Sequence, residues 1–390
     1  PRVAANKQAS KPRPAIAIVA LGVRAATRTS AGDFADALYH DTSELRSGAP
    51  GLDTPSAFMA DVSLGLAGTR FPPRDLRESL PQQLALLAAC GEAIDTLGEA
   101  AFDSERTAVL VGMQCDTTVA RHGGRWRMAE WGARWGASDE WIAAARDGFA
   151  PLLGSAGVLG CMPNICANRV NSHFDFCGPS YTVSSEELSG VRALQIARRD
   201  LSLDRLDMAI VGAVDLCAEP AHQAAYAELA GARPAGDAAV VLVLERLVDA
   251  HKSGHRVLAI LDDDAQAATT AWDPTVVERR FGHAHAASGL LQIAAAAVAC
   301  ARRRYPDRAT PDMPAATVLE VTVEALGDQR VSVTLRPDEE RAPASLSPHE
   351  PLAGPQLVVA GHLPEVVLPS DPHRATETMP PSPPLAPPAH

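Results

Sequence analysis

Two adjacent carboxylates stand where a predicted strand meets a predicted helix. In the segment "GPSYTVSSEELSGVRAL", Glu186 and Glu187 occupy this turn, which contains no cysteine. A sharp strand-to-helix turn is a common place for a catalytic nucleophile. Ser184, three residues before Glu187, also fits a capping box, and carboxylates in a first helical turn suit the helix dipole. The residues therefore fit either a structural helix start or a site that has lost its nucleophile.

Two histidines open a second predicted helix. The segment "FGHAHAASG" places His283 and His285 at the start of a helix over 282–304. An imidazole there can act as an acid–base group, and His283 is the better candidate of the two. With no nucleophile nearby, we favour a structural role. A metal site built on this pair lacks further ligands at useful spacing in the sequence, so we expect no metal.

The cysteines give no sign of a metal or disulfide framework. The chain has seven of them, an odd number, and none forms a CxxC pair. Cys166 and Cys177 lie near the two carboxylates in sequence, but neither stands at a helix start, where a thiol pKa is lowered. We interpret them as packing residues and expect no cofactor.

Short apolar runs alternate with helical periodicity along most of the chain. Buried strands rich in Val, Ile and Leu, separated by helices, are typical of an α/β fold. The predicted helices cover 31–40, 80–98, 162–175, 187–199 and 282–304, and the predicted strands cover 14–22, 107–113, 207–216, 237–247 and 257–264, with two more inside 317–338.

Residues 114–160 hold four of the five tryptophans, interleaved with arginines. Tryptophan and arginine are enriched at the centres of protein interfaces. We therefore predict an amphipathic helical excursion whose rings pack into the core or a subunit interface. A nucleic-acid surface is disfavoured because the net charge is −12.

The two ends of the chain differ in composition from its body. Residues 1–13 are polar and are predicted to be a flexible linker. The last forty residues contain eleven prolines, so 339–390 is predicted to be an extended proline-rich linker, leaving 14–338 as the folded domain. The chain starts at a proline, and we interpret it as a piece of a longer polypeptide. No apolar run is long enough to cross a membrane, and we expect a cytoplasmic protein without nucleic-acid or membrane partners.

The carboxylate turn carries a family resemblance. "GPSYTVSSEELSGVRAL" resembles the nucleophile segment of β-ketoacyl synthases, in which Gly-Pro-Ser and a strand precede Thr-Ala-Cys-Ser-Ser-Ser at a helix start. "LPQQLALLAACGEAID" resembles the family's Asp-Pro-Gln-Gln-Arg segment, "LDMAIVGAVDL" a later strand, and "FGHAHAASGLLQIAAAA" the Gly-His motif with its helix. The resemblance covers roughly residues 14–338, and its strength comes from many segments agreeing in order.

The chain departs from this family at each catalytic part. Glu187 matches the nucleophilic cysteine, the first catalytic histidine segment has no counterpart, and Glu278 replaces a lysine before the second histidine motif. Decarboxylative condensation needs a thiolate, two imidazoles and oxyanion donors. We therefore expect no catalytic residue. The degenerate site comprises Ser184, Glu186, Glu187 and His283, and the counterpart of the oxyanion loop comprises Leu326, Gly327 and Asp328.

The resemblance is closest to the family's non-condensing members. "MPNICANRVNSHFDFCGPSYTVSSEELSG" looks like the chain-length-factor domains of polyunsaturated fatty acid synthases and of iterative type I polyketide or glycolipid synthases. This implies a thiolase-type five-layered αβαβα fold, with two mixed sheets around central helices and a trimmed second half. It also implies a pseudo-twofold heterodimer with an active ketosynthase, and the acyl carrier protein of the same synthase as a partner.

A paired domain of this kind needs an interface and an acyl tunnel. The face formed by 107–120 and 162–187 is expected to be apolar. Two alternatives stay open, a malonyl-thioester decarboxylase or priming domain and a purely structural docking domain of a megasynthase. The interface or tunnel candidates are Met113, Cys115, Trp126, Phe174 and Phe176.

Overall fold

The chain divides into two compact units. The larger comprises residues 1–117 and 154–364, and the smaller comprises 118–153 and 365–390. The structure, a computed structural model, describes residues 14–40, 42–49, 51–97, 103–114, 116–262, 269–307, 312–346, 354–363, 366 and 368–370.

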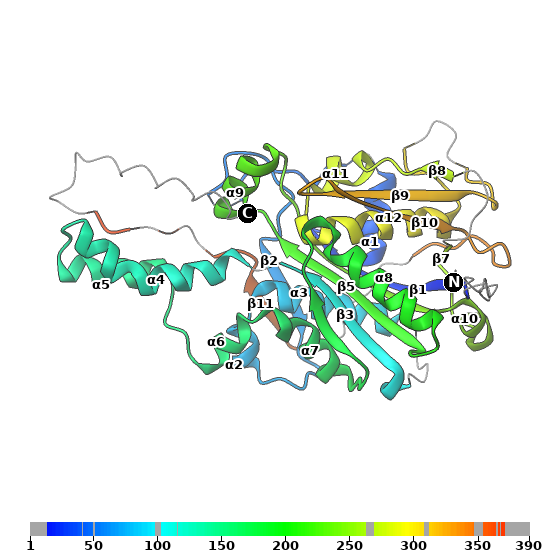
Figure 1. Ribbon diagram of the computed structural model, residues 1–390, viewed down its shortest axis with the longest axis horizontal. Coiled ribbons are helices and arrows are strands. Elements are labelled where there is room, and N and C mark those ends of the chain that lie inside the picture. Colours follow the sequence, from blue (N-terminus) through cyan, green and yellow to red (C-terminus); the bar gives the residue numbers. More distant parts are fainter. Residues whose placement is uncertain are drawn as a thin grey trace, which may run out of the picture. The chain divides into compact units, whose positions relative to one another are not determined.

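A mixed sheet of nine strands forms the centre of the larger unit, in the order β4-β3-β5-β6-β1-β7-β10-β9-β8 (Figure 1). Parallel pairs lie toward both ends of the sheet and antiparallel pairs in the middle. The strands are β1 (Ile16–Ala25), β3 (Thr107–Met113), β4 (Ser180–Val183), β5 (Met208–Leu216), β6 (Asp237–Arg246), β7 (Ala259–Leu261), β8 (Thr269–Ala271), β9 (Val318–Ala325) and β10 (Gln329–Arg336).

The α/β prediction is confirmed, but the expectation of two separate sheets is wrong. The strand sets β4-β3-β5-β6-β1 and β7-β10-β9-β8 are joined where Ile16, Ala17 and Ile18 of β1 pair with β7. This short antiparallel contact makes one hydrogen-bonded sheet of the two sets.

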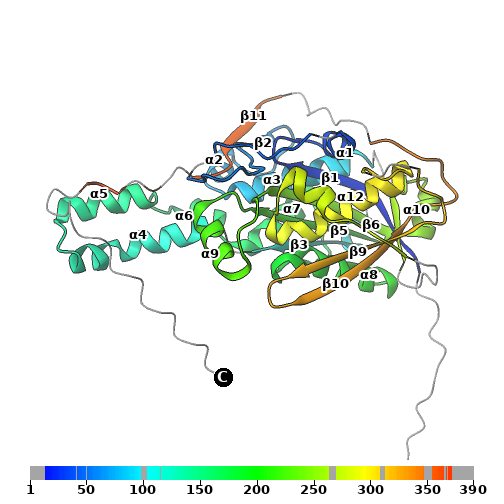
Figure 2. The ribbon, with the colours of Figure 1, turned by 90° about the horizontal axis from the view of Figure 1, so that it is seen from above.

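Two helices lie between the two strand sets. Helix α8 (Ser189–Ser202) packs on β3 and β5, and α12 (Ser288–Arg302) packs on β9, β10 and α8 (Figure 1). Helix α3 (Pro81–Asp95) contacts β1, β5 and β6, and α7 (Pro163–Phe174) contacts β3 and β4 (Figure 2). Strands β3 and β5 are buried along their whole length, as expected for strands covered by helices on both faces. The remaining helices of this unit are α1 (Ala31–Tyr39), α2 (Pro73–Arg77), α6 (Ser155–Gly160), α9 (Pro220–Ala230), α10 (Leu247–Ser253) and α11 (Thr275–Phe281).

The trimming of the second half appears in β9 and β10. Their burial alternates along each strand, with one face toward α12. The other face is polar: Thr322 and Ser332 share a hydrogen bond of 2.8 Å, and Arg330 pairs with Glu324. Such alternation is typical of a sheet with one solvated face. An outer helical layer is therefore missing from these two strands within the described ranges.

Part of the predicted C-terminal linker is folded. Strand β11 (Gln356–Ala360) pairs antiparallel with β2 (Asp61–Gly65) in a separate two-stranded sheet. The extended-linker prediction is therefore wrong for 354–363, where the apolar run "QLVVA" between prolines supplies a strand. Residues 1–13 and 371–390 lie outside the described residues.

A buried carboxylate ties this C-terminal segment to the body. Asp237, at the start of β6, accepts from the amides of Ala218 (2.9 Å) and Met59 (2.8 Å). The same side chain also pairs with the ring Nε2 of His362, just beyond β11. One fully buried side chain thus fixes the end of β5, the approach to β2 and the exit of β11.

The smaller unit holds the tryptophan-rich segment as two helices, α4 (Thr117–Arg134) and α5 (Asp139–Phe149), which confirms the helical prediction. Its rings pack on one another, with centroids 6.4 Å apart for Trp131 and Trp135 and 6.0 Å for Trp135 and Trp141. The indole of Trp141 donates to the carbonyl of Pro369 (2.6 Å). Trp126 is 69% exposed. These rings therefore form a cluster of their own.

Gly112 and Gly190 allow α8 to lie directly on β3. A Cβ at Gly112 would meet the backbone nitrogen of Gly190 at 2.2 Å. We predict that Gly112→Ala lowers the free energy of unfolding by about 1–3 kcal/mol, the usual cost of overpacking a core. Gly91→Ala is the control, because a Cβ there meets nothing within 4 Å on helix α3. Urea denaturation of both variants measures the effect, and equal stabilities would contradict this account of the packing.

The ion pair between His362 and Asp237 predicts that the stability of the fold depends on pH. Burial opposes protonation, but the Asp237 carboxylate outweighs it and raises the pKa of His362 above its ordinary value. A raised pKa stabilises the fold below the unfolded value of about 6.5, and this contribution is lost as pH rises through the folded value. His362→Gln should therefore be less stable than the parent at pH 6, with the gap closing at higher pH. Denaturant titrations at several pH values measure this, with exposed His40→Gln as control. A gap independent of pH would contradict the prediction.

Candidate functional site

The carboxylate turn follows β4 and has an uncommon backbone. Glu186 has φ 48°, in the left-handed region, and residues Glu186–Leu188 form one 3₁₀ turn before α8. The amide of Ser185 donates to the hydroxyl of Ser189 (2.9 Å), which donates to the carbonyl of Glu186 (2.6 Å). The predicted capping box is wrong: Ser184 instead donates to the side-chain oxygen of Gln114 (2.7 Å).

The turn before α12 repeats this local structure. His285 has φ 36° and opens the 3₁₀ turn His285–Ala287. The amide of Ala284 donates to the hydroxyl of Ser288 at 2.9 Å, as Ser185 does to its own serine four residues on. The sequences "SEELSG" and "AHAASG" share the serine and the glycine that follow the turn. Because α8 and α12 pack together, the two turns bring the carboxylates and the histidines to one place.

Glu187 is a buried carboxylate whose two oxygens are both engaged. Its side chain is 3% exposed. The hydroxyl of Tyr226, on α9, donates to Oε1 (2.6 Å), and the amide of Leu326, in the β9–β10 turn, donates to Oε2 (3.1 Å). His283 Nε2 lies 3.5 Å from Oε1. The side chain predicted to match the nucleophile is thus bound by the turn predicted to match the family's oxyanion loop.

The groups around Glu187 are held in their neutral forms. Burial, with Arg233 nearby, lowers the pKa of His283 well below its ordinary value. Burial and the hydrogen bond to Glu187 raise the pKa of Tyr226 well above its usual range, so the phenol remains a donor. The guanidinium of Arg233 lies 5.3 Å from the centre of the Tyr226 ring. A neutral imidazole and a phenol beside a carboxylate stabilise that carboxylate and provide no nucleophile.

His285 lies in a second group beside the first. Its Nε2 is 2.9 Å from Glu186, and its Nδ1 is 3.1 Å from Asp215 at the end of β5. Burial opposes protonation, but Asp215 outweighs it and raises the pKa of His285. The ring of His222, on α9, lies 5.0 Å from that of His285, and burial lowers the pKa of His222.

Further metal-ligand types do surround His285, contrary to the sequence interpretation. The ligand atoms of Cys217, His222 and His285 lie within 4.8 Å of one another. Burial and the neighbouring Asp215 raise the pKa of the Cys217 thiol well above its usual range. Cys217 and His222 lie far before His285 in the sequence, and only the fold brings the three side chains together.

The interface and tunnel candidates are dispersed. Met113 and Phe176 are buried, Phe174 is half-buried, and Cys115 lies outside the described residues. The exposed ring of Trp126 belongs to the smaller unit. Gly327 and Asp328 complete the β9–β10 turn with positive φ angles of 77° and 58°. The structure therefore gathers Glu186, Glu187, His283 and Leu326 and leaves Ser184 on Gln114.

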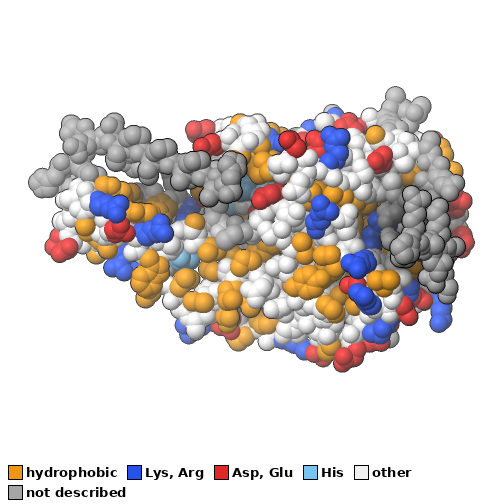
Figure 3. Space-filling view, in the orientation of Figure 1, with side chains coloured by type: hydrophobic (Ala, Val, Ile, Leu, Met, Phe, Trp, Pro, Cys, Tyr) orange, Lys and Arg blue, Asp and Glu red, His pale blue; other side chains and the backbone are white. Residues whose placement is uncertain are grey.

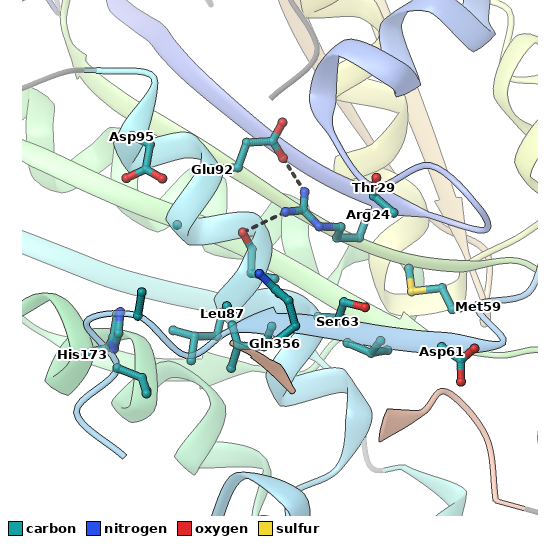
Figure 4. A pocket seen from close by; sticks show the side chains of 18 of the residues that line it. Arg24, Thr29, Met59, Asp61, Ser63, Leu87, Glu92, Asp95, His173 and Gln356 are labelled. Carbon is teal, nitrogen blue, oxygen red and sulfur yellow. Dashed lines mark hydrogen bonds and ion pairs between the residues drawn. The ribbon is translucent and has the colours of Figure 1, made fainter. Parts of the chain in front are cut away.

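A cavity of about 520 Å³ lies elsewhere in the larger unit (Figure 4). It is lined by β2, α3 and the end of α7, including Phe174. Arg24 projects into it and is held by Glu92 and the carbonyl of Ala88. Glu187 and His283 are not among its lining residues, so this cavity is separate from the carboxylate site.

The site residues predicted from the sequence did not include Tyr226, His222, Asp215 or Cys217. The first two stand at i and i+4 in "HQAAYAELA", which places them on one face of a helix. That spacing was a usable signal for two polar rings acting together. Nothing in the sequence linked Tyr226 to Glu187, 39 residues away.

The sheet with two central helices, each opened by a serine-anchored turn, defines an α/β fold of the thiolase type. The chain belongs to the β-ketoacyl synthase family, since the model of the "Beta-ketoacyl synthase, N-terminal domain" matches residues 13–250. The "PfaC Keto synthase-Chain length factor" structure has a TM-score of 0.71 at 16% identity, covering 90% of this chain and 44% of that chain. The ketosynthase from module 6 of the bacillaene synthase of Bacillus subtilis 168 has a TM-score of 0.62 at 17% identity, covering 83% and 71%. The predicted fold class and family are confirmed.

The related proteins are parts of large synthases. The spectinabilin polyketide synthase system protein NorA' of Streptomyces orinoci is 29% identical over 56% of this chain, and this chain spans 6% of its length. A polyunsaturated fatty acid synthase component of a Thraustochytrium species is 28% identical over 41% of this chain, which spans 8% of that protein. Within the described residues, no helix is both long and apolar enough to cross a membrane.

The hydrogen bond between Tyr226 and Glu187 predicts energetic coupling. Tyr226→Phe leaves a buried carboxylate oxygen without its donor, so stability should fall by about 1–3 kcal/mol. In a Glu187→Ala background the same change should cost much less, giving a coupling energy of about 0.5–3 kcal/mol. Denaturation of the four proteins of this cycle measures it. The control is Glu228→Ala, at an exposed position on the same helix, whose effect on stability should add to that of Tyr226→Phe. If the effects of Tyr226→Phe and Glu187→Ala are also additive, the contact between these two side chains is refuted.

Proposed function

We propose that this chain is a non-condensing ketosynthase-like domain of the chain-length-factor type, which pairs with a condensing ketosynthase and helps shape its acyl tunnel. The observation that carries the proposal is the state of Glu187. Its carboxylate accepts from Leu326 and Tyr226 at the position where the family places a reactive thiol.

The engaged Glu187 carboxylate is unsuited to the acyl transfer, oxyanion binding and malonyl binding that condensation requires. A carboxylate is a poor acyl acceptor compared with a thiolate. The Leu326 amide, which an oxyanion would require, is already bound to Glu187. Glu186 and Glu187 would also repel the carboxylate of a malonyl extender. The site therefore supports the fold and leaves acyl transfer to another chain.

The edge of the sheet supports pairing. Among the described strands, β4 stands at the end of the sheet and pairs only with β3. An uncovered strand edge is a template for another chain. Tyr181 in β4 and Leu159 and Met162 before α7 are exposed apolar side chains, and Figure 3 shows hydrophobic side chains gathered over the middle of the face that carries α7 and α8.

The comparisons support the same proposal at the level of fold. The structure with a TM-score of 0.71 is described as a ketosynthase–chain length factor, and the relatives are multidomain synthases. The proposed partners of this chain are a condensing ketosynthase and the acyl carrier protein of the same synthase. The proposed domain spans 14–338 together with the docked segment 354–363, in a cytoplasmic assembly.

Pairing is tested with the condensing ketosynthase domain of the producing organism. Size-exclusion chromatography with light scattering should show a one-to-one complex, and Tyr181→Asp should weaken it at least tenfold because a charge is then buried at the edge. Val248→Asp is the control, since Val248 is 74% exposed on α10. A monomer that never binds the ketosynthase would overturn the proposal. Rapid decarboxylation of malonyl carrier protein by the chain alone would favour the priming-domain alternative.

Restoring the thiol should not restore condensation. Glu187→Cys frees the Leu326 amide, but the family's first catalytic histidine segment still has no counterpart in this chain. A missing acid–base group costs about 10²–10⁴ in rate, so we predict no ketoacyl product above the background of the parent. Mass spectrometry after incubation with acyl thioester and malonyl carrier protein measures it, with the condensing domain as positive control. Product above background would show that an acid–base apparatus is present.

A further inference from the structure

The group of Cys217, His222 and His285 is not used by the proposed function. Cys217 follows β5 and is fully buried, His222 lies in the first turn of α9, and His285 opens the turn before α12. Their sulfur and ring nitrogen atoms lie within 4.8 Å of one another. We propose that these three side chains bind a transition-metal ion of the zinc class.

His222 provides an independent sign of a missing ligand. Its Nε2 is buried and has no hydrogen-bond partner within the described part of the chain. A buried polar atom left unsatisfied typically costs about 1–3 kcal/mol. A metal ion at the centre of the three side chains would use the lone pair of this nitrogen.

The second nitrogen of His285 already has an orienting partner. Its Nδ1 lies 3.1 Å from Asp215 Oδ2, which also accepts from the amide of Ala286 (3.3 Å). A carboxylate on the far nitrogen is the usual partner of a metal-binding imidazole, because it fixes the tautomer and raises ligand basicity. His285 Nε2 is then the atom that faces the metal.

Glu186 can supply a fourth ligand. Its carboxylate lies 2.9 Å from His285 Nε2, and its side chain is 45% exposed, so on metal binding it would exchange this hydrogen bond for a bond to the metal. In tetrahedral zinc sites the metal–sulfur and metal–nitrogen bonds of about 2.3 and 2.0–2.1 Å set the ligand atoms roughly 3.3–3.6 Å apart. Binding would therefore draw the three ligand atoms closer together than the 4.8 Å within which they now lie. Sulfur and imidazole ligands favour zinc or cobalt over magnesium or calcium.

The local charge also favours a cation. Carboxylates of Asp215, Glu186 and Glu219 lie around the three ligands, and Arg233 lies against the ring of Tyr226. A bound metal would tie α9 to the turn before α12 and so hold Tyr226 beside Glu187. This proposal does not depend on pairing with a ketosynthase, because the ligands all come from this chain.

The test is titration of the reduced, chelator-treated chain with cobalt(II) and then zinc. Cobalt should bind one ion per chain, with the near-ultraviolet thiolate-to-metal absorption band that identifies a cysteine ligand, and zinc should displace it and raise the melting temperature. Cys217→Ala should abolish the band, and His222→Gln should keep it while weakening cobalt binding at least tenfold. Cys300→Ala and His40→Gln, at a buried and an exposed position away from the site, are the matched controls.

The parent titration decides the proposal even if a variant misfolds. Absence of a thiolate band in the folded parent would overturn it, as would a band that survives Cys217→Ala in folded protein. Binding that is lost equally in Cys300→Ala would also overturn it, since that residue does not contact the site.

Discussion

The carboxylate of Glu187 is the constraint on which the site depends. A charged group that is 3% exposed must be satisfied, and its donors come from α9 and from the β9–β10 turn. These contacts join elements of both strand sets around the start of α8. One of these donors, the Leu326 amide, lies in the turn that is predicted to match the family's oxyanion loop. Under the proposed function, the contacts that stabilise Glu187 would also remove the condensing chemistry.

The same local turn structure occurs twice around this carboxylate, before α8 and before α12. Before α8 and again before α12, a residue with a left-handed backbone conformation begins a 3₁₀ turn. The amide of the residue just before it donates to the hydroxyl of a serine four residues further along the chain. Small residues then let the following helix lie against its neighbours, as Gly190 does against Ala213 and Leu290. The two helix starts meet, which places Glu186 on His285. A cluster of carboxylates and imidazoles results at the two helix starts.

Much of the fold followed from patterns in the sequence. The strand predicted at 107–113 is β3 over its whole length. A short, continuous apolar run between polar residues is typical of a buried strand. The match of Glu187 to the nucleophile position rests on the family resemblance and stays a prediction. The capping box failed because the left-handed Glu186 shifts the helix start to Ser189, and β11 was missed because prolines surround it. Tyr226 could not be linked to Glu187, since that contact depends on tertiary packing.

The most direct test of the account is the state of the Leu326 amide. In protein labelled with ¹⁵N at leucine, hydrogen exchange followed by NMR reports whether this turn amide is hydrogen-bonded. The account predicts slow exchange at Leu326 in the parent and fast exchange in Glu187→Ala, with the core amide of Leu335 unchanged as an internal reference. Fast exchange at Leu326 in the parent, or protection that persists without the carboxylate, would contradict the claim that Glu187 occupies the oxyanion donor.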